Sequence, residues 1–171
     1  NMGKKLRFRS ISKVIQEIHM LYHEYGVREF HIIDDLFNFK KQRVIDFCRG
    51  IRKSKINISY TFPNGLRLNH LDLEILQLMK STGAYSFNVG IESGSQRILE
   101  MIKKNLTLEL IKEKINLIVK CGLEPCGFFI IGFPEETEEI KGIKLGAVDF
   151  ISKPFNPTIV KSKVQNHVEL K

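Results

Sequence analysis

The sequence lacks the features that mark a membrane-spanning or secreted chain. No apolar run approaches the roughly 18 residues that a membrane-spanning helix needs. The charged start NMGKKLRFRS has no apolar core of the kind found in signal peptides. Low-complexity tracts are absent too, and 171 residues suffice for one domain with a real core but not for two complete domains. These absences favour a soluble, cytoplasmic protein.

Cysteine is scarce, and its spacing does not predict a metal site. Cys121 and Cys126 have no second pair nearby, whereas structural zinc sites usually combine two closely spaced pairs. We expect reduced thiols, with Cys48 on the buried face of a helix. Neither GxxxxGK[ST] nor GxGxxG occurs, so the sequence does not indicate a nucleoside triphosphate or dinucleotide site.

Basic residues outnumber acidic residues, and the net charge is +8. Lys and Arg are scattered over every segment rather than gathered on one stripe, so the charge is weak evidence for nucleic-acid binding. The densest basic group lies within residues 4–9. It has two interpretations, a contact for phosphate or carboxylate and a solvated basic terminus, and the second is favoured.

Apolar periodicity predicts alternating helices and strands. Helices are expected at about residues 10–25, 38–53, 71–80, 95–104 and 108–120, and buried strands at about 28–34, 56–62, 85–91 and 125–132. Ser10, Asn69 and Thr107 are predicted N-caps, and Gly26, Gly83 and Gly122 follow helix ends. The alternation argues for a parallel sheet covered by helices. It does not separate a barrel from an open doubly wound sheet.

Polar residues follow each predicted strand. They are Asp34, Asp35 and Asn38, then Asn64 and Arg67, then Glu92, Ser93 and Ser95, then Gly132, Pro134 and Glu136. The carboxyl ends of parallel strands meet at one edge of a sheet, where ligands bind. Each residue also has a purely structural interpretation, as a helix cap, a first-turn acid or a surface ion pair. Their convergence on one edge favours a binding site.

The chemistry of these residues suits a zwitterionic, nucleoside-like ligand. Carboxylates accept hydrogen bonds from an ammonium group or from ribose hydroxyls, and an arginine holds a carboxylate through two parallel hydrogen bonds. Glycines at 90, 94 and 132 permit close approach of the backbone to a flat ring or a sugar. A polyphosphate fits this set of residues less well.

The segments RFRS, FHIIDDLFN, NGLR, NVGIESGSQRIL and GFFIIGFPEET together resemble the radical S-adenosylmethionine (SAM) enzymes. The subset often preceded by a cobalamin-binding domain is the most similar. The resemblance covers about residues 2–137 and implies an α/β fold, an incomplete (β/α) barrel with SAM at its top. It implies that Asp34 and Asp35 hold the methionine amino group and that Glu92 and Ser93 contact ribose and carboxylate. Gly132, Pro134 and Glu136 would line the adenine, and Arg67 completes the predicted cofactor-binding set.

One part of the family pattern is absent from this sequence. The family binds a [4Fe–4S] cluster through a CxxxCxxC loop, which by resemblance would precede residue 2. Cys48, Cys121 and Cys126 do not match that motif. Since the cluster supplies the electron that reaches the sulfonium, we expect a truncated chain that does not cleave SAM alone.

Residues from about 140 resemble the end of a different domain, the last third of a response-regulator receiver. By this resemblance Lys153 is the phosphate-contacting lysine, Lys153–Pro154 is a candidate cis peptide, and Phe150 stands at the aromatic switch position. The strand that carries the phosphoacceptor aspartate is missing, so phosphorylation is not expected. The alternative is a generic β-α unit that completes the barrel.

The sequence therefore predicts two parts, an incomplete radical SAM domain at residues 1–139 and a receiver-like fragment at residues 140–171. The expected cofactor is SAM, with the [4Fe–4S] cluster confined to the parent family. The expected partners are this small molecule and a protein bound through the last helix, with no clear nucleic-acid or membrane partner. Two alternatives are a signalling or interaction module built on the receiver fragment and a non-functional gene-fusion product.

Overall fold

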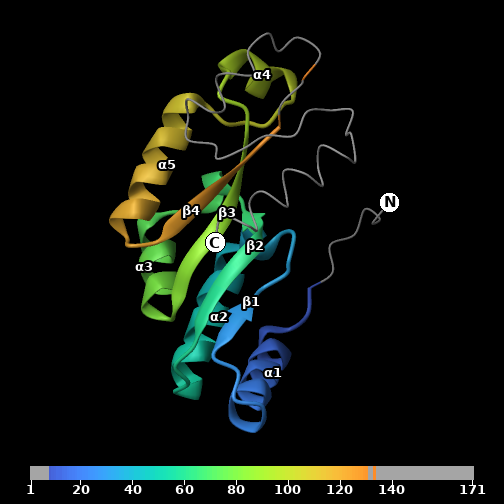
Figure 1. Ribbon diagram of the computed structural model, residues 1–171, viewed down its shortest axis with the longest axis vertical. Coiled ribbons are helices and arrows are strands. Elements are labelled where there is room, and N and C mark those ends of the chain that lie inside the picture. The colour runs from blue at the N-terminus through green and yellow to red at the C-terminus, as the bar shows by residue number, and fades with distance from the viewer. Residues whose placement is uncertain (1–7, 131–132, 134–171) are drawn as a thin grey trace, which may run out of the picture. The chain divides into compact units, whose positions relative to one another are not determined.

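The computed structural model describes residues 8–130 and residue 133, and there it shows the predicted alternation of helices and strands (Figure 1). The elements are α1 (Ile11–Glu24), β1 (Glu29–His31), α2 (Lys41–Ser54), β2 (Ser59–Leu66), α3 (Leu73–Ser81), β3 (Ala84–Glu92), α4 (Gln96–Met101), α5 (Leu108–Lys120) and β4 (Glu124–Phe129). Short 3-10 helices, Phe37–Phe39 and Leu68–His70, follow β1 and β2. The described residues divide into two compact units, one of residues 8–89 with 113–126 and the other of residues 90–112 with 127–130 and 133.

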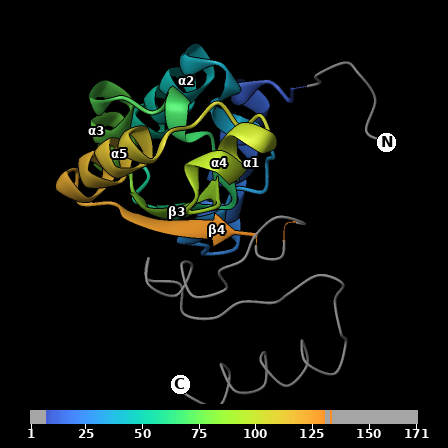
Figure 2. The same ribbon diagram turned by 90° about the horizontal axis from the view of Figure 1, so that it is seen from above.

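The strands form one parallel sheet in the order β1-β2-β3-β4. Phe30 of β1 lies opposite Tyr60 of β2, and Phe62 of β2 lies opposite Phe87 of β3. Helices α1, α2 and α3 lie on the same face of the sheet (Figure 2). The predicted α/β fold is confirmed. Sequential strand order with helices on one face is the arrangement of a barrel wall, not of a doubly wound sheet.

The core of the first unit lies between the sheet and helices α2 and α3. It is rich in aromatic rings, since Phe37, Phe47, Tyr60 and Phe62 are almost completely buried. Neighbouring rings in this group have centroids 4.7 to 5.7 Å apart, mostly in edge-to-face contact. Such pairs add to the free energy gained by burying the large apolar surface of each ring. Cys48 is fully buried on α2, as predicted, and its thiol lies beside the Tyr60 hydroxyl.

The predicted helix caps are only partly correct. Ser10 precedes α1, but its side chain makes no capping hydrogen bond. Helix α3 is capped by Asp72, whose carboxylate accepts from the Ile75 N–H at 2.9 Å, and not by Asn69. The cap at Thr107 is confirmed, because its hydroxyl accepts from the Leu110 N–H at 3.1 Å. The prediction missed Asp72 because it began the helix two residues too early.

Two predictions of secondary structure need correction. Other predictions fall on residues that the structure does not describe. Helix α2 begins at Lys41 rather than near residue 38, because residues 37–39 form a separate 3-10 helix. Strand β1 is not buried, since its first and last side chains are exposed. Gly132, Pro134 and Glu136 lie outside the described residues, as does the receiver-like segment 140–171 with Phe150, Lys153 and Pro154. Within the described part, no helix is long and apolar enough to cross a membrane.

Candidate functional site

The two aspartates after β1 have different surroundings. Asp34 is partly buried, accepts from the Leu36 N–H at 2.9 Å, and lies 3.6 Å from the guanidinium of Arg43. Asp35 is exposed, and its carboxylate accepts from the side-chain amide of Asn64 at 2.9 Å. The charge of Asp34 therefore has a cationic neighbour, whereas the one side-chain donor to Asp35 among the described residues is neutral. Asp35 is the better placed of the two to accept a hydrogen bond from a ligand.

Arg43 was not predicted as a site residue. Its guanidinium is largely buried, lies over the rings of Phe8 and Phe37, and donates to the carbonyl oxygen of Arg9 at 2.8 Å. Its Nε is buried and has no hydrogen-bond partner among the described residues. An unpaired buried donor costs free energy unless another group completes it. No sequence signal indicated this residue, because an arginine in the first turn of an amphipathic helix is usually exposed.

Asn38 determines how β2 ends. Its side chain is buried, its Nδ2 donates to the carbonyl oxygen of Arg67, and its Oδ1 accepts from the Arg67 N–H, both at 2.9 Å. The interpretation of Asn38 as a routine helix cap is therefore wrong. Its amide pairs with the backbone of Arg67 and joins the segments that follow β1 and β2. The guanidinium of Arg67 lies over the Phe39 ring and is exposed.

A bulge near the end of β2 places Asn64 beside Asp35. Phe62 lies opposite Phe87 and Leu66 opposite Val89, so β2 advances from 62 to 66 while β3 advances from 87 to 89. The intervening residues include Gly65, whose φ of +92° requires a glycine in practice. Bulges often re-aim side chains next to functional sites. Here the bulge places the side-chain amide of Asn64 where it donates a hydrogen bond to the Asp35 carboxylate.

In the second unit, Glu92 ends β3 with a φ of +70°, an uncommon conformation for a residue with a side chain. Its carboxylate accepts from the ammonium of Lys104 at 2.5 Å. Lys103 and Asn105, on either side of Lys104, also have positive φ values. Four non-glycine residues in the described part have a positive φ, and three of them belong to the Glu92–Lys104 ion pair or flank Lys104. Backbone strain of this kind clusters at functional sites.

Lys104, the partner of Glu92, is the second residue of the candidate site that sequence reasoning missed. The ion pair folds over Gly90, where a Cβ atom would lie 2.7 Å from Glu92 Oε1 and 3.1 Å from Lys104 Nζ. The glycine at 90 was the one available signal, and it was interpreted as room for a ligand rather than room for an ion pair. Ser93 is buried next to Glu92, and its hydroxyl accepts from the Ser95 N–H at 3.1 Å. Ser95 stands at the N-cap position of α4, but its side chain makes no capping hydrogen bond. The favoured interpretation of this side chain as a helix cap is therefore wrong.

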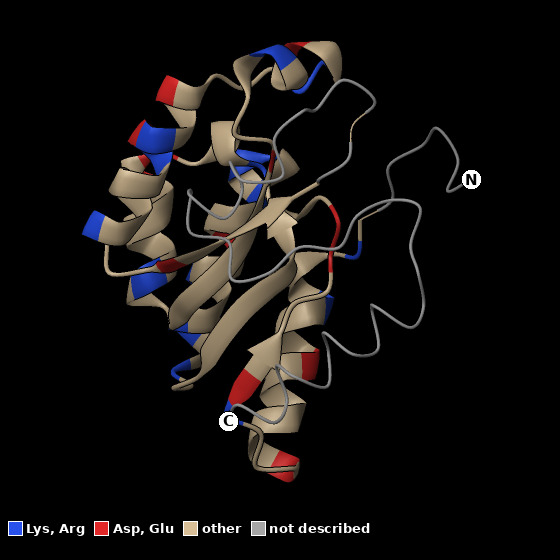
Figure 3. Cartoon of the chain, turned by 45° about the horizontal axis from the view of Figure 1, so that its top comes forward, with Lys and Arg blue, Asp and Glu red and all other residues tan. Residues whose placement is uncertain are grey.

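The cysteines of this chain do not fit an iron–sulfur cluster. Cys48 is buried in α2, whereas Cys121 follows α5 and Cys126 is exposed on β4. No group of three His, Cys, Asp or Glu side chains able to hold a metal ion occurs in residues 8–130 or at 133. Basic residues are spread over the described helices and their ends, as predicted (Figure 3).

Comparison with known proteins identifies the family. The model of the radical SAM superfamily matches residues 1–143. An uncharacterized methyltransferase of Pyrococcus horikoshii is 39% identical over 137 residues, covering 80% of this chain and 29% of the relative. The cytidylyl-2-hydroxyethylphosphonate methyltransferase of Streptomyces wedmorensis is 40% identical over 133 residues, covering 77% of this chain and 24% of the relative. This chain thus spans less than a third of the length of either relative.

Solved structures share the fold at lower sequence identity. The radical SAM methyltransferase TsrM from Kitasatospora setae, with cobalamin and a [4Fe–4S] cluster bound, has a TM-score of 0.65 at 20% identity and covers 75% of this chain and 26% of that chain. The cobalamin-dependent SAM radical enzyme OxsB, with SAM and aqua-cobalamin bound, has a TM-score of 0.64 at 21% identity. It covers 72% of this chain and 20% of that chain. The arrangement of sheet and helices is therefore that of a radical SAM barrel wall.

Proposed function

Since this chain belongs to the radical SAM superfamily, we propose that it forms part of the SAM-binding barrel of a larger enzyme that transfers a methyl group. Two curated relatives with about two-fifths identity are named as methyltransferases, which supports this reaction class. The solved structures include a cobalamin-dependent enzyme and a methyltransferase with cobalamin bound, which supports cobalamin as a further cofactor of the whole enzyme.

The ion pair between Glu92 and Lys104 is the observation that carries the proposal. Lys104 already supplies a cation to the carboxylate. A second cation would therefore add less interaction free energy at the Glu92 carboxylate. This carboxylate is suited to accept hydrogen bonds from the neutral hydroxyls of a ribose. Asp35, which accepts from a neutral amide, is suited to the methionine ammonium.

The other predicted residues are also part of the proposal, with the role of Asp34 changed from holding the methionine amino group to supporting Asp35. The exposed guanidinium of Arg67 would hold the methionine carboxylate through two parallel hydrogen bonds, while Asn38 holds the backbone of Arg67 in place. Asp34 pairs with Arg43 and supports the segment that carries Asp35. Ser93 would lie beside the ribose, and Gly132, Pro134 and Glu136 would line the adenine.

This chain alone is proposed to bind and orient SAM without cleaving it. In the family the cluster, when bound, supplies the electron that splits SAM into methionine and a 5′-deoxyadenosyl radical. The 171 residues contain no CxxxCxxC motif to hold it. Anaerobic reconstitution with iron and sulfide, followed by an assay for 5′-deoxyadenosine, should give no turnover. Substantial 5′-deoxyadenosine formation by this chain would overturn this part of the proposal.

Calorimetric titration of the full chain with SAM tests the binding site. Glu92→Gln keeps the size of the side chain but removes its charge, and it should weaken SAM binding about 10- to 100-fold, the usual cost of a lost charge-assisted hydrogen bond. Glu113→Gln, a change at an exposed glutamate on α5, is the matched control and should leave the affinity unchanged. Equal affinities of the wild type and Glu92→Gln, or no SAM binding by the wild type, would contradict the proposed site.

The signalling alternative has no further support. It rests on the resemblance of residues 140–171 to a receiver domain, and these residues lie outside the described part. The family model ends at residue 143. A SAM affinity that depends on Glu92 would favour the enzyme interpretation over this alternative.

A further inference from the structure

Three segments of the first unit meet at the guanidinium of Arg43, in the first turn of α2. Its Nη1 donates to the carbonyl oxygen of Arg9 at 2.8 Å, and its Nη2 lies 3.6 Å from the carboxylate of Asp34. Its central carbon lies 5.1 Å from the centroid of the Phe8 ring and 5.6 Å from that of the Phe37 ring. These contacts join the segment before α1, the loop after β1 and the 3-10 helix that follows this loop.

The burial of Arg43 indicates that these contacts hold the segments together. Its side chain is only 10% exposed, and a guanidinium keeps its charge in proteins, so at this depth it needs oxygen partners. The Arg9 carbonyl and the Asp34 carboxylate supply them. Removing one member of a buried charge pair leaves the other charge without a partner, which is costly. Arg43 therefore differs from a surface arginine, whose contacts contribute little.

One edge of the guanidinium, the edge formed by Nε and Nη2, faces the loop after β1. An arginine can hold a carboxylate from this edge through two parallel hydrogen bonds. Nη2 is the atom nearest to the Asp34 carboxylate, and Nε is buried without a hydrogen-bond partner among residues 8–130 and 133. Asp34 Oδ1 also accepts from the Leu36 N–H at 2.9 Å. The carboxylate of Asp34 is therefore held by the backbone of its own loop on one side and by α2 on the other.

Asp34 carries the effect of Arg43 to its neighbour Asp35. The Cα atoms of consecutive residues are about 3.8 Å apart across a rigid peptide unit, so a displaced Asp34 displaces Asp35 as well. The Asp35 carboxylate accepts from the side-chain amide of Asn64 at 2.9 Å and is proposed to hold the methionine ammonium. Binding groups work when their geometry is held within about 0.5 Å. A contact that fixes Asp34 therefore fixes the carboxylate offered to SAM.

The segment before α1 is attached to the same guanidinium. The Phe8 ring lies near two cations, since the ammonium of Lys40 is 5.6 Å from its centroid and the guanidinium of Arg43 is 5.1 Å from it. Such cation–π contacts gain strength where the cation is desolvated, as Arg43 is. The side chain of Arg9 forms an ion pair with Glu17 of α1, while its carbonyl oxygen accepts from Arg43. Arg43 thus contacts this segment on one side and the Asp34 loop on the other.

We propose that Arg43 is a positioning residue that couples the segment at Phe8 and Arg9 to the SAM-binding loop at Asp34 and Asp35. It acts through Asp34 and does not itself contact SAM. The inference rests on the proposed SAM site and adds a dependence that the site residues alone do not imply. A change at the Phe8 ring, which is outside the set of residues proposed to contact SAM, should alter SAM affinity by way of the guanidinium.

A double-mutant cycle on SAM affinity, measured by calorimetric titration of the full chain, tests the coupling. Arg43→Gln and Phe8→Ala should each weaken SAM binding about 2- to 30-fold, the usual range for residues that act on a site without touching its ligand. In the double variant the Phe8→Ala change should have little further effect, because the guanidinium that transmits it is gone. Arg49→Gln, at an exposed arginine on the same helix, is the matched control and should leave the affinity unchanged.

A second measurement reports on the loop without SAM. The side-chain amide of Asn64 donates to Asp35, so its NMR signals should shift in Arg43→Gln and in Phe8→Ala but not in Arg49→Gln. Circular dichroism checks that each variant folds. If Arg43→Gln does not fold, Asp34→Asn replaces it in the cycle, since it keeps the shape of the side chain and removes the charge that Arg43 holds.

The outcomes separate this inference from the proposed SAM site. Wild-type SAM affinity in the folded variants, losses that simply add in the double variant, or unmoved Asn64 signals would overturn the positioning role and leave the site standing. Lower thermal stability with unchanged affinity would show a purely structural role and would overturn it too. No SAM binding by the wild type would overturn the proposed site, and this inference with it.

Discussion

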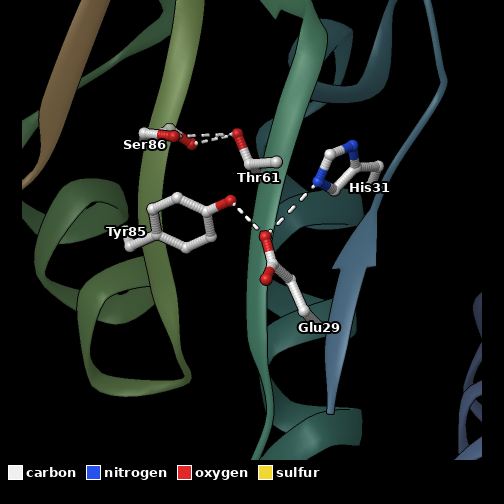
Figure 4. Close-up of polar contacts among 5 residues, drawn as sticks. All are labelled: Glu29, His31, Thr61, Tyr85 and Ser86. Atoms are coloured by element: carbon white, nitrogen blue, oxygen red, sulfur yellow. Dashed lines mark hydrogen bonds and ion pairs between the residues drawn. The ribbon is translucent and has the colours of Figure 1, made fainter. Parts of the chain in front are cut away.

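The two faces of the sheet differ sharply although the same strands build both. On the face toward the helices, Tyr60, Phe62 and Phe87 are completely buried. On the opposite face the side chains of Glu29 and His31 are each more than half exposed, at 57% and 59%. Apolar burial is the main source of folding free energy. The difference indicates that the face toward the helices stabilises the fold, whereas charged and polar side chains lie on the other face (Figure 4).

The largest expected effect comes from the buried face. Phe62→Ala removes a ring whose centroid lies 4.7 Å from that of Phe37 and 5.7 Å from that of Tyr60. It should lower the free energy of unfolding by about 3–5 kcal/mol, because the space left by the ring cannot close fully. Denaturant unfolding followed by circular dichroism measures the change. Phe128→Ala, at an exposed ring, is the matched control, and losses of equal size would mean that burial on this face does not dominate stability.

A smaller effect is expected from the one buried phenol on the same face. The Tyr60 hydroxyl donates to the carbonyl oxygen of Met79 at 3.2 Å and pairs with the Thr82 hydroxyl at 2.8 Å. Tyr60→Phe should cost about 1 kcal/mol in unfolding free energy, since the Thr82 hydroxyl still has the carbonyl oxygen of Leu78 as a partner. Tyr25→Phe, at an exposed tyrosine, should cost nothing measurable in the same unfolding experiment. A Tyr60→Phe variant as stable as the wild type would contradict a structural role for this hydroxyl.

The smallest effect is expected on the face of the sheet opposite α1, α2 and α3. There a substitution should change the pKa of Glu29 rather than the free energy of unfolding. The pKa of Glu29 is lowered first by the Tyr85 hydroxyl and then by His31. A lowered folded-state pKa contributes stability above the unfolded pKa, and this contribution is lost as the pH falls through the folded pKa. Tyr85→Phe should raise the pKa of Glu29 toward its ordinary value of 4.5, as measured by NMR of the carboxyl carbon. An unchanged pKa would show that this hydrogen bond does not form in solution.

The order of elements was predictable because it depends on local patterns. Apolar periodicity located α1, β2, β3 and α5 to within a few residues. Thr107 was a correct cap because capping involves only the next three residues. The location of Asp35 and Glu92 at strand ends followed from the same reasoning, since a residue that follows a parallel strand lies at its carboxyl edge.

Residues that act through distant partners were not predictable. Asn38 pairs with the backbone of Arg67, 29 positions away in the sequence, and no local pattern indicates that contact. Lys104 was not singled out from the sequence, because only the fold of the loop that carries it places its ammonium beside Glu92. Arg43 in the first turn of α2 was not singled out from the sequence, and its burial depends on the rings of Phe8 and Phe37 that pack around it.

The sequence by itself determined the alternation of helices and strands, the parallel sheet and the residues at the strand ends, because each depends on periodicity and on the residues that follow a strand. Tertiary structure alone decided which charges are paired, which polar groups are buried, and which face of the sheet the described helices cover. The bulge at Tyr85, which lies in β3 between the partners of Tyr60 and Thr61, is the clearest case. One extra residue relative to β2 changes which side chains share a face, and that register exists only when the two strands pair.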